Sequence, residues 1–289
     1  MRPPSSPHRP RKRFAQHFLA PQWAAKVVSA IAPQPGDVIL EIGPGAGALT
    51  LPLAATGVSI LGVEIDRDLV ADLAARAPRN VTIVSGNILK TDVLPFLSGL
   101  EPQHTPAVTD LSRPRRRFRV VGNLPYNLST PILFRLVELQ HQHAAFADAT
   151  IMLQREVADR LVAVPGTKAY CVLTILLGLH ARITRLLDLP PGAFRPAPKV
   201  QSAVVRLEFR ASPVRVNDAK LLERVVKRAF GQRRKTLANA LAGLVKDPRA
   251  LLAAAGIDPK RRPETLDLTE FATLVDHIGG TSTAKPAVL

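Results

Sequence analysis

A short apolar run that ends in a glycine-rich turn constrains the fold of this chain more than any other feature. Residues 38–40 are Val-Ile-Leu, they follow the turn residues 33–36, and they lead into the glycine-rich segment 43–47. Such a run is typical of a buried strand that feeds a helix through a tight turn. Glycines at this turn allow a ligand to approach the backbone closely. The pattern therefore predicts an α/β sheet with a ligand site at one strand end.

Strand and helix patterns alternate after this turn. Because parallel strands need crossover connections, the alternation predicts a mostly parallel sheet, covered by helices on both faces. Residues 170–177 and 202–209 are two further apolar, β-branched runs whose connecting loop allows antiparallel pairing at a sheet edge. The other expected strands are 38–40, 59–63, 81–84 and 120–122, and the expected helices of this part are 21–31, 49–55, 69–77, 131–141 and 152–162.

Composition suggests how the chain is divided. After residue 213 the apolar residues Leu221, Val225 and Ala229 recur at helical spacing, which predicts a small helical domain. Residues 101–119 hold prolines and an arginine cluster and are expected to form a solvated loop. The predicted organisation is a disordered basic arm at 1–10, an α/β domain at 11–212, a helical domain at 213–278 and a tail at 279–289.

The charge of the chain indicates a polyanionic partner. Its 289 residues include 39 Lys and Arg against 23 Asp and Glu, a formal net charge of +16, which exceeds what solubility requires. Cys171 is the single cysteine, and no His and Cys spacing fits a zinc site, so we expect no disulfide and no metal. No apolar stretch is long enough to cross a membrane, so a soluble cytoplasmic protein is expected.

The glycine-rich turn and an acidic residue after the next strand predict a nucleoside site. Gly43, Gly45 and Ala48 satisfy a dinucleotide-binding fingerprint, and Glu64 lies about 20 residues further on. A carboxylate at this place accepts hydrogen bonds from both ribose hydroxyls. A hydride carrier and a methyl donor both contain this ribose, so the segment leaves the two cofactors open.

A second motif, at residues 122–127, follows the predicted strand 120–122 and favours methyl transfer. An adenine amine is a poor nucleophile because its lone pair is conjugated into the ring. The amide oxygen of Asn123 and a backbone carbonyl in the turn Leu124-Pro125 can accept its two N–H bonds, which favours a pyramidal nitrogen. Tyr126 offers a ring on which an extruded base can stack. Asn123, Leu124, Pro125 and Tyr126 are therefore the predicted catalytic residues.

With these motifs in place, the sequence resembles the ribosomal RNA adenine dimethyltransferases, and specifically the bacterial 16S small-subunit enzymes, from about residue 11 to about residue 274. The resemblance implies a Rossmann-like S-adenosylmethionine-dependent methyltransferase sheet with a small C-terminal helical domain. It also implies dimethylation of two adjacent adenosines in a 3′-terminal hairpin of 16S rRNA within an immature small subunit, by a monomer. Seven ordered motifs carry it, at residues 11–19, 41–47, 63–66, 122–127, 152–157, 194–200 and 229–237.

The resemblance also assigns the residues that bind the cofactor. The implied contacts to S-adenosylmethionine are His17, Leu19, Gly43, Gly45, Glu64, Asn87 and Asn123. Two of them depart from the family pattern, which has Asn in place of His17 and Asp in place of Asn87. An amide oxygen at Asn87 still accepts a hydrogen bond but lacks charge assistance, so we expect weaker donor affinity.

Two further expectations concern the substrate. The resemblance points to Phe194 as a second aromatic wall of the adenine pocket, and its Pro-rich surroundings favour a role outside the core. Basic residues crowd one stretch of the predicted helical domain and are expected to contact RNA phosphates. They are Arg224, Lys227, Arg228, Arg233, Arg234 and Lys235.

Three alternatives remain at this point. A large-subunit rRNA adenine methyltransferase of the antibiotic-resistance type shares both site motifs, but residues 194–200 and 232–235 favour the small-subunit enzyme. An RNA-binding assembly or transcription factor with a vestigial site is disfavoured by the intact Asn123, Pro125 and Tyr126. A nicotinamide oxidoreductase would show binding of that cofactor.

Overall fold

The structure is a computed structural model that describes residues 17–100 and 118–282. The chain divides into two compact units, which are described separately below. The first contains the chain up to Ala158 together with Thr184–Phe209, and the second contains Asp159–Ile183 and the chain from Arg210 onward. The predicted basic arm 1–10 and most of the predicted loop 101–119 lie outside the described residues.

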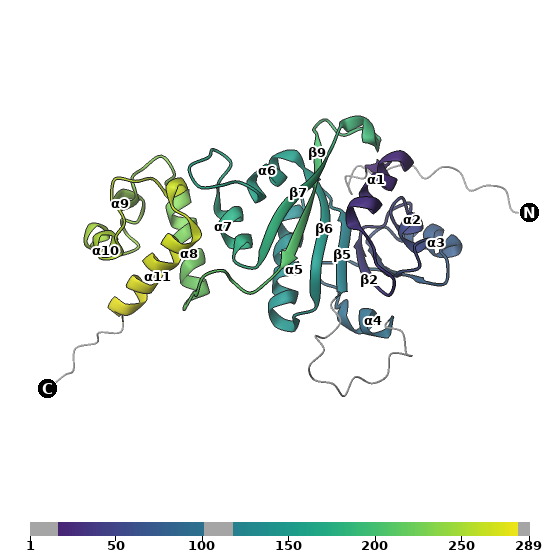
Figure 1. The fold of residues 1–289 in the computed structure, drawn as a ribbon, viewed down its shortest axis with the longest axis horizontal. Helices are drawn as coiled ribbons and strands as arrows, with labels where there is room; N and C mark the ends of the chain where they lie inside the picture. Colours follow the sequence, from purple (N-terminus) through teal and green to yellow (C-terminus); the bar gives the residue numbers. More distant parts are fainter. Residues whose placement is uncertain (1–16, 101–117, 283–289) are drawn as a thin grey trace, which may run out of the picture. The chain divides into compact units, whose positions relative to one another are not determined.

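A seven-stranded sheet runs through the described part of the chain (Figure 1). Its strand order is β4-β3-β2-β5-β6-β9-β7. The pairs β2–β3, β3–β4, β2–β5 and β5–β6 are parallel, and β9 pairs antiparallel with β6, so the expected α/β class is confirmed. The strands are β2 (Val38–Ile42), β3 (Ser59–Glu64), β4 (Val81–Ser85), β5 (Phe118–Asn123), β6 (Phe146–Gln154), β7 (Ala181–Leu189) and β9 (Ser202–Phe209).

Strand β2 lies at the point where the sheet changes direction. The chain runs outward from β2 through β3 to β4, and then returns to place β5 on the other side of β2. All five residues of β2 are buried, as expected for a strand covered on both faces. Ligands of open α/β sheets bind beyond the carboxyl ends of the strands at such a switch point. The site is therefore expected beyond Ile42 and Asn123.

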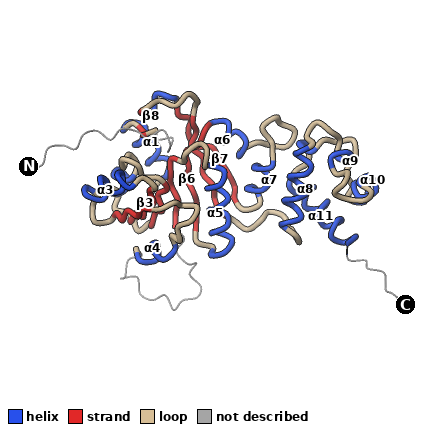
Figure 2. Tube along the Cα trace, turned by 180° about the vertical axis from the view of Figure 1, so that it is seen from behind, coloured by secondary structure: helices blue, strands red, loops and turns tan. Residues whose placement is uncertain are grey.

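Helices cover the sheet of the first unit (Figure 2). Helices α1 and α2 pack on one face through Val27, Ile31 and Leu53, which share a buried cluster with Ile39 and Val121 of the sheet. The helices of this unit are α1 (Pro21–Ile31), α2 (Thr50–Ala54), α3 (Arg67–Arg76), α4 (Leu94–Gly99) and α5 (Ser129–His143), and α6 (Arg155–Leu161) follows β6 across the boundary.

A two-stranded sheet joins the start of the described chain to a segment far along the sequence. Strand β1 (Phe18–Leu19) pairs antiparallel with β8 (Phe194–Arg195), which follows a 3-10 turn at Pro191–Ala193. The N–H of Ala20 adds a hydrogen bond of 2.8 Å to the carbonyl of Ala193. This pairing fixes the chain just before α1 against β8 and the turn that precedes it.

The second unit is helical and has its own core. Helix α8 buries Leu222, Val225 and Ala229 against Phe271 of α11. The side chain of Asp218 caps α8 by accepting the N–H of Leu221 at 2.9 Å. The helices are α7 (Val172–Gly178), α8 (Ala219–Gly231), α9 (Leu237–Ala240), α10 (Pro248–Ala254) and α11 (Leu268–Ser282), with a 3-10 turn at Pro263–Thr265.

Several predicted elements differ from the structure. Residues 152–154, expected in a helix, complete β6, because Met152 pairs with both Asn123 and Val204. Residues 170–177, expected as a strand, contain α7 instead. This segment is apolar almost throughout, so its period does not distinguish strand from helix. The Cys171 and Thr174 capping box starts the helix.

The ends of two elements also differ from the prediction. Strand β5 begins at Phe118, inside the predicted loop, and β9 pairs with β6 rather than with residues 170–177. Helix α11 continues to Ser282, so residues 279–282 of the predicted tail are helical. The second compact unit resumes at Arg210, near the predicted boundary at 213, and also includes Asp159–Ile183. The functional labels given to the domains stay predictions.

Candidate functional site

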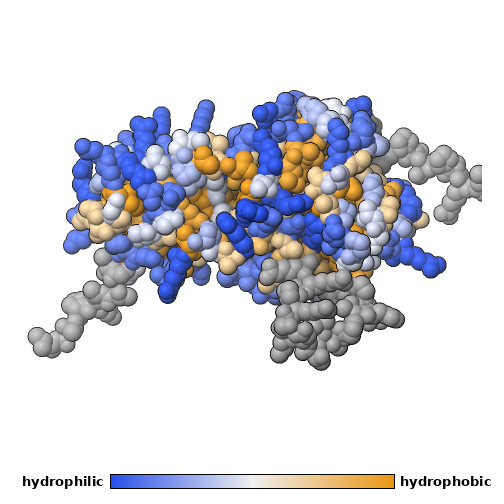
Figure 3. Space-filling model, in the orientation of Figure 1, coloured by the Kyte–Doolittle hydropathy of each residue, from blue (hydrophilic) through white to orange (hydrophobic). Residues whose placement is uncertain are grey.

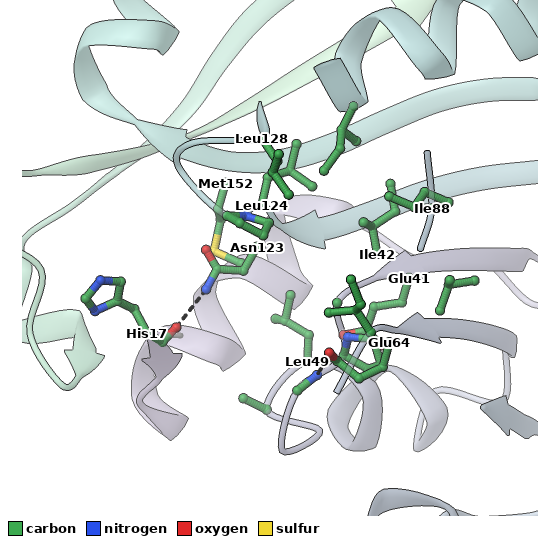
Figure 4. A pocket seen from close by; sticks show the side chains of 18 of the residues that line it. His17, Glu41, Ile42, Leu49, Glu64, Ile88, Asn123, Leu124, Leu128 and Met152 are labelled. Carbon is green, nitrogen blue, oxygen red and sulfur yellow. Dashed lines mark hydrogen bonds between the residues drawn. The ribbon is translucent and has the colours of Figure 1, made fainter. Parts of the chain in front are cut away.

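One pocket of the described residues lies beyond the carboxyl ends of β2, β3, β4 and β5, where the topology predicts it. We divide its lining into two sides; Figure 4 shows Glu41 and Glu64 of one side apart from His17 and Asn123 of the other. The glycine-loop side consists of Glu41, Gly43, Gly45, Glu64 and Asn87. The Asn123 side consists of His17, Asn123, Leu124, Pro125 and Tyr126. Leu19 also lines the pocket, so the seven predicted cofactor contacts line one cavity together with Leu124, Pro125 and Tyr126.

The glycine turn after β2 has the backbone geometry that its sequence predicts. Gly43 has φ +68° and Gly45 has φ +55°, values that residues with a Cβ rarely adopt. A Cβ at Gly45 would lie 3.1 Å from the ring of Phe18. Both glycines line the pocket, so the turn presents main chain to a ligand.

Glu64, at the end of β3, holds this turn against the sheet. One carboxylate oxygen accepts the N–H of Gly45 at 3.0 Å, and the other accepts the N–H of Asp66 at 2.9 Å. The side chain is buried. Each carboxylate oxygen has two lone pairs, so both retain capacity to accept a hydroxyl hydrogen of a bound ribose.

Glu41 is a second buried carboxyl group on the glycine-loop side, and sequence reasoning gave it no role. It is 2% exposed, and its Oε2 has no hydrogen-bond partner within the described residues. Burial raises the pKa of Glu41 to about 7; the Thr50 hydroxyl opposes this rise, and the charge of Glu64 adds to it. The signal was its place at the end of a wholly buried strand, inside the glycine motif. An unpartnered buried oxygen beside a pocket is suited to accept from a cationic ligand group.

Asn87 follows β4 and also lines the pocket. Its Oδ1 accepts the N–H of Leu89 at 3.0 Å, which closes a local turn. The neighbouring Ile88 and the 47% exposed Ile65, which follows Glu64, add apolar lining that sequence reasoning missed. The available signal in the sequence was an isoleucine directly after Glu64. These two side chains are suited to contact the flat faces of a purine.

On the other side, Asn123 is held in one orientation by the main chain. Its Nδ2 donates to the backbone carbonyl of His17 at 2.8 Å (Figure 4). A carbonyl oxygen only accepts, so this bond fixes which end of the amide is nitrogen. The Oδ1 of Asn123 is thereby left as an acceptor next to the pocket.

The turn after Asn123 places Tyr126. The N–H of Leu124 donates to the carbonyl of Met152 at 3.2 Å, and that of Leu128 donates to Pro125 at 2.9 Å. The Tyr126 hydroxyl lies 2.8 Å from the Oγ of the buried Ser202. Burial raises the pKa of Tyr126, and the hydrogen bond to Ser202 acts in the opposite direction.

The expectation that Phe194 lies outside the core is wrong. Its ring is 0% exposed, it belongs to the cluster that contains Val27 and Val204, and it does not line the pocket. The pairing of β8 with Leu19 of β1 turns this side chain inward. The aromatic ring that the structure places beside Tyr126 is the imidazole of His17, at 5.6 Å between ring centroids.

The predicted phosphate-binding residues all lie in the second unit. Arg224, Lys227, Arg228, Arg234 and Lys235 are exposed, and hydrophilic residues cover much of the face of this unit seen in Figure 3. Arg233 is half-buried and engaged, because it donates to the carbonyl of Thr167 and lies 3.8 Å from the carboxylate of Glu264.

No group of three or more His, Cys, Asp or Glu side chains is arranged to hold a metal ion in residues 17–100 and 118–282. Across the same ranges, none of the helices combines the length and apolarity needed to cross a membrane.

Comparisons with known proteins show the family of this chain. Residues 7–279 match the family described as Ribosomal RNA adenine dimethylase. The chain is 44% identical over 282 residues to Ribosomal RNA small subunit methyltransferase A of Acinetobacter baylyi, with 96% of each covered. It is 45% identical over 280 residues to the protein of the same name from Aromatoleum aromaticum, covering 96% of this chain and 97% of that protein.

Solved structures support the fold. A dimethyladenosine transferase from Plasmodium falciparum has a TM-score of 0.73 at 22% identity, covering 92% of this chain and 98% of that one. The 23S rRNA methyltransferase ErmE has a TM-score of 0.61 at 21% identity, with coverages of 91% and 99%. Since the family match and both relatives extend over nearly the whole length, this chain belongs to the ribosomal RNA adenine dimethylase family.

Proposed function

We propose that this protein transfers methyl groups from S-adenosylmethionine to the exocyclic amino groups of adenosines in small-subunit ribosomal RNA. The observation that carries the proposal is the fixed amide of Asn123, whose Oδ1 remains an acceptor beside the pocket formed with Glu64 and the glycine turn. The relatives at 44% and 45% identity bear the small-subunit name, which favours this RNA over that of the large subunit.

The glycine-loop side fits the methyl donor. Glu64 would accept from the ribose hydroxyls, Asn87 from the adenine amine, and Glu41 offers an unpartnered oxygen to the positively charged methionine end. The main chain at Gly43 and Gly45 would allow the methyl donor to approach closely, and Leu19 would add an apolar contact to it. When bound, S-adenosylmethionine supplies a methyl group on a cationic sulfur.

The Asn123 side would hold the target base. The Oδ1 of Asn123 and a carbonyl of the Leu124-Pro125 turn accept the two amine hydrogens, so that the nitrogen lone pair faces the methyl group. Tyr126, anchored at Ser202, provides a ring for stacking. No strong base is needed before attack, because orienting the lone pair is the main requirement.

The exposed cations of the second unit would bind RNA phosphates. Arg224, Arg234 and Lys235 are the clearest candidates, since Lys227 pairs with Glu223, Arg228 donates to the carbonyl of Ala242, and Arg233 is engaged by Thr167 and Glu264. Replacing Arg224, Arg234 and Lys235 by Gln should weaken RNA binding and reduce the magnitude of the slope of log K against log salt by about two to three. An unchanged slope would remove these residues from the interface.

The substrate is proposed in finer detail from the family resemblance. It is a pair of adjacent adenosines in a 3′-terminal hairpin of 16S rRNA, modified within an immature small subunit in the cytoplasm by a monomeric enzyme. Transfer of radiolabelled methyl groups tests this, with small subunits from cells that lack the protein as substrate and large subunits as control. Mapping dimethyladenine in the product identifies the positions.

An Asn123→Ala variant is the matched control for this assay. It should lose about 100-fold in kcat, because the amine is no longer oriented, while the Kd for S-adenosylmethionine changes less. Equal methylation by wild type and Asn123→Ala would contradict the proposed mechanism. Label found only in large subunits would contradict the proposed substrate.

A further inference from the structure

The ring of Tyr126 is firmly held at its hydroxyl end. The hydroxyl is paired with the Oγ of Ser202, which is 1% exposed and begins β9. The ring itself is half-buried and lines the pocket. Since its edge is anchored, the phenol presents a fixed platform on which another ring can lie.

The ring that lies on this platform is the imidazole of His17. The two centroids are 5.6 Å apart and the ring planes differ by 24°, which is a stacked arrangement. The Nδ1 of His17 lies 2.7 Å from the backbone carbonyl of Pro196. A carbonyl only accepts, so Nδ1 carries the hydrogen and donates it. Among residues 17–100 and 118–282, one side-chain hydrogen bond and one stacking contact therefore hold the imidazole.

The backbone of His17 is anchored independently of its ring. Its carbonyl accepts the Nδ2 of Asn123, and the next residue, Phe18, pairs with Arg195 in the β1–β8 sheet. The side chain can consequently rotate away while the main chain keeps its contacts. Rotation would break the bond to Pro196 and the stack on Tyr126, but would leave the amide of Asn123 in place.

The spacing of the two rings leaves no room for a base between them. Stacked atoms approach to about 3.5 Å, so a purine inserted between two rings requires their planes to be about 7 Å apart. The observed 5.6 Å between centroids is shorter. A base that stacks on this face of Tyr126 must therefore take the place of the imidazole.

We propose that His17 occupies the stacking place of the target adenine on Tyr126 and that the entering base displaces it. This inference rests on the proposed function, because it assumes that the base stacks on Tyr126. His17 then acts as a specificity-determining residue. Only a base with a large ring surface outcompetes the imidazole, and only one with an exocyclic amine gains the Oδ1 of Asn123 at the same time.

Steady-state methylation with His17→Ala tests whether the imidazole competes with the target base. With S-adenosylmethionine saturating and small subunits varied, the KM for particles should fall about 2- to 10-fold, since a competing ring is removed, while kcat changes less. A KM that rises in His17→Ala overturns the inference, because the imidazole would then help to bind the base. An unchanged KM also overturns it, because the imidazole would then not compete with the base. The Kd for S-adenosylmethionine is measured separately by calorimetry, since His17 lines the same pocket.

His17→Phe is the matched control variant. It keeps a ring that can stack on Tyr126 but lacks the donor to Pro196, so its KM should stay within about twofold of wild type. A purely structural role through the Pro196 bond predicts instead that His17→Phe and His17→Ala behave alike. That result would overturn the inference.

A binding experiment separates this inference from the proposed function. Adenosine monophosphate is titrated into full-length protein saturated with S-adenosylhomocysteine, which keeps the nucleotide out of the donor site, while the ring protons of His17 are followed by NMR. Stacking on Tyr126 should shift these resonances upfield, and the shift should disappear as the nucleotide binds. Loss of the shift supports displacement even if no RNA is methylated, whereas a shift that persists at saturation contradicts it.

Discussion

The two sides of the pocket are built in different ways. The glycine-loop side comes from consecutive strand ends between Glu41 and Asn87, and backbone N–H bonds to Glu64 that span 19 and 2 positions hold it together. The Asn123 side joins residues far apart in sequence, since the bond of Asn123 to His17 spans 106 positions and that of Tyr126 to Ser202 spans 76. Local motifs thus specify the first side, whereas only the folded chain assembles the second.

The largest expected effect concerns Phe194. The sequence predicted this residue as a wall of the adenine pocket on the Asn123 side, whereas the structure places it in the core. Because its ring is wholly buried, Phe194→Ala should lower the free energy of unfolding by about 3–5 kcal/mol. Urea denaturation measures this value. Phe194→Leu fills most of the space and should cost clearly less. Full stability combined with a raised KM for RNA would restore Phe194 to the pocket wall and remove it from the core.

The next effect tests the buried carboxyl group of the glycine-loop side. Burial raises the pKa of Glu41 from 4.5 to about 7, so the unfolded chain releases this proton at lower pH than the folded chain does. The contribution of protonated Glu41 to the free energy of unfolding is therefore fully present below pH 4.5 and is lost as the pH rises through about 7. It amounts to about 3 kcal/mol.

Glu41→Gln is the comparison that isolates this group. The amide does not titrate, so the unfolding free energies of wild type and variant should diverge between pH 4.5 and pH 7, with wild type losing the stability. Urea titrations at several pH values measure the difference. Curves that run parallel over this range would show that Glu41 titrates normally in the folded protein.

A matched pair of variants tests whether the two sides act separately. Glu64→Ala should weaken S-adenosylmethionine binding by about 1.5–3 kcal/mol, because charge-assisted hydrogen bonds are lost. Tyr126→Ala should cost about 1–3 kcal/mol in RNA binding through lost stacking. Calorimetry with the methyl donor should show weaker binding mainly for Glu64→Ala. Filter binding with RNA should show weaker binding mainly for Tyr126→Ala. If both variants weakened both ligands equally, the division of the pocket would fail.

The smallest effect concerns Asn87, where the resemblance leads us to expect Asp. Replacing Asn87 by Asp provides a charged acceptor, and the expected gain of about 1 kcal/mol corresponds to roughly fivefold tighter binding of S-adenosylmethionine. Calorimetry with wild type and Asn87→Asp measures this change. An unchanged Kd would mean that the assignment of Asn87 to the donor is wrong.

The same contrast explains what could be predicted from the sequence. The glycine turn, Glu64 and the parallel strands follow from short-range patterns, and the structure brings Gly43, Gly45 and Glu64 to one cavity as expected. Phe194 was misplaced because its burial depends on the pairing of β8 with β1, which no local pattern encodes. The contact of His17 with Tyr126 was missed for the same reason.

The secondary structure could likewise be predicted where a local pattern marks it, and not where tertiary packing decides it. Strand β2 was predicted because its buried run ends at distinctive glycines, and its neighbours alternate with amphipathic helices. Helix α7 was mistaken for a strand because its apolar residues are nearly continuous, and its contacts with the core of the second unit decide the outcome. Local pattern specifies an element where polar residues mark its faces, and tertiary packing specifies it elsewhere.

The hydrogen bond that orients Asn123 has an evolutionary consequence. Its acceptor is a main-chain carbonyl, which every amino acid at position 17 provides. Substitution there can therefore alter which nucleobase enters, or how tightly the cofactor is held, without disturbing the reactive amide. An exchange of the side chain at position 17 can in this way change ligand recognition in one mutational step, because the main-chain carbonyl that orients Asn123 is kept whatever the side chain.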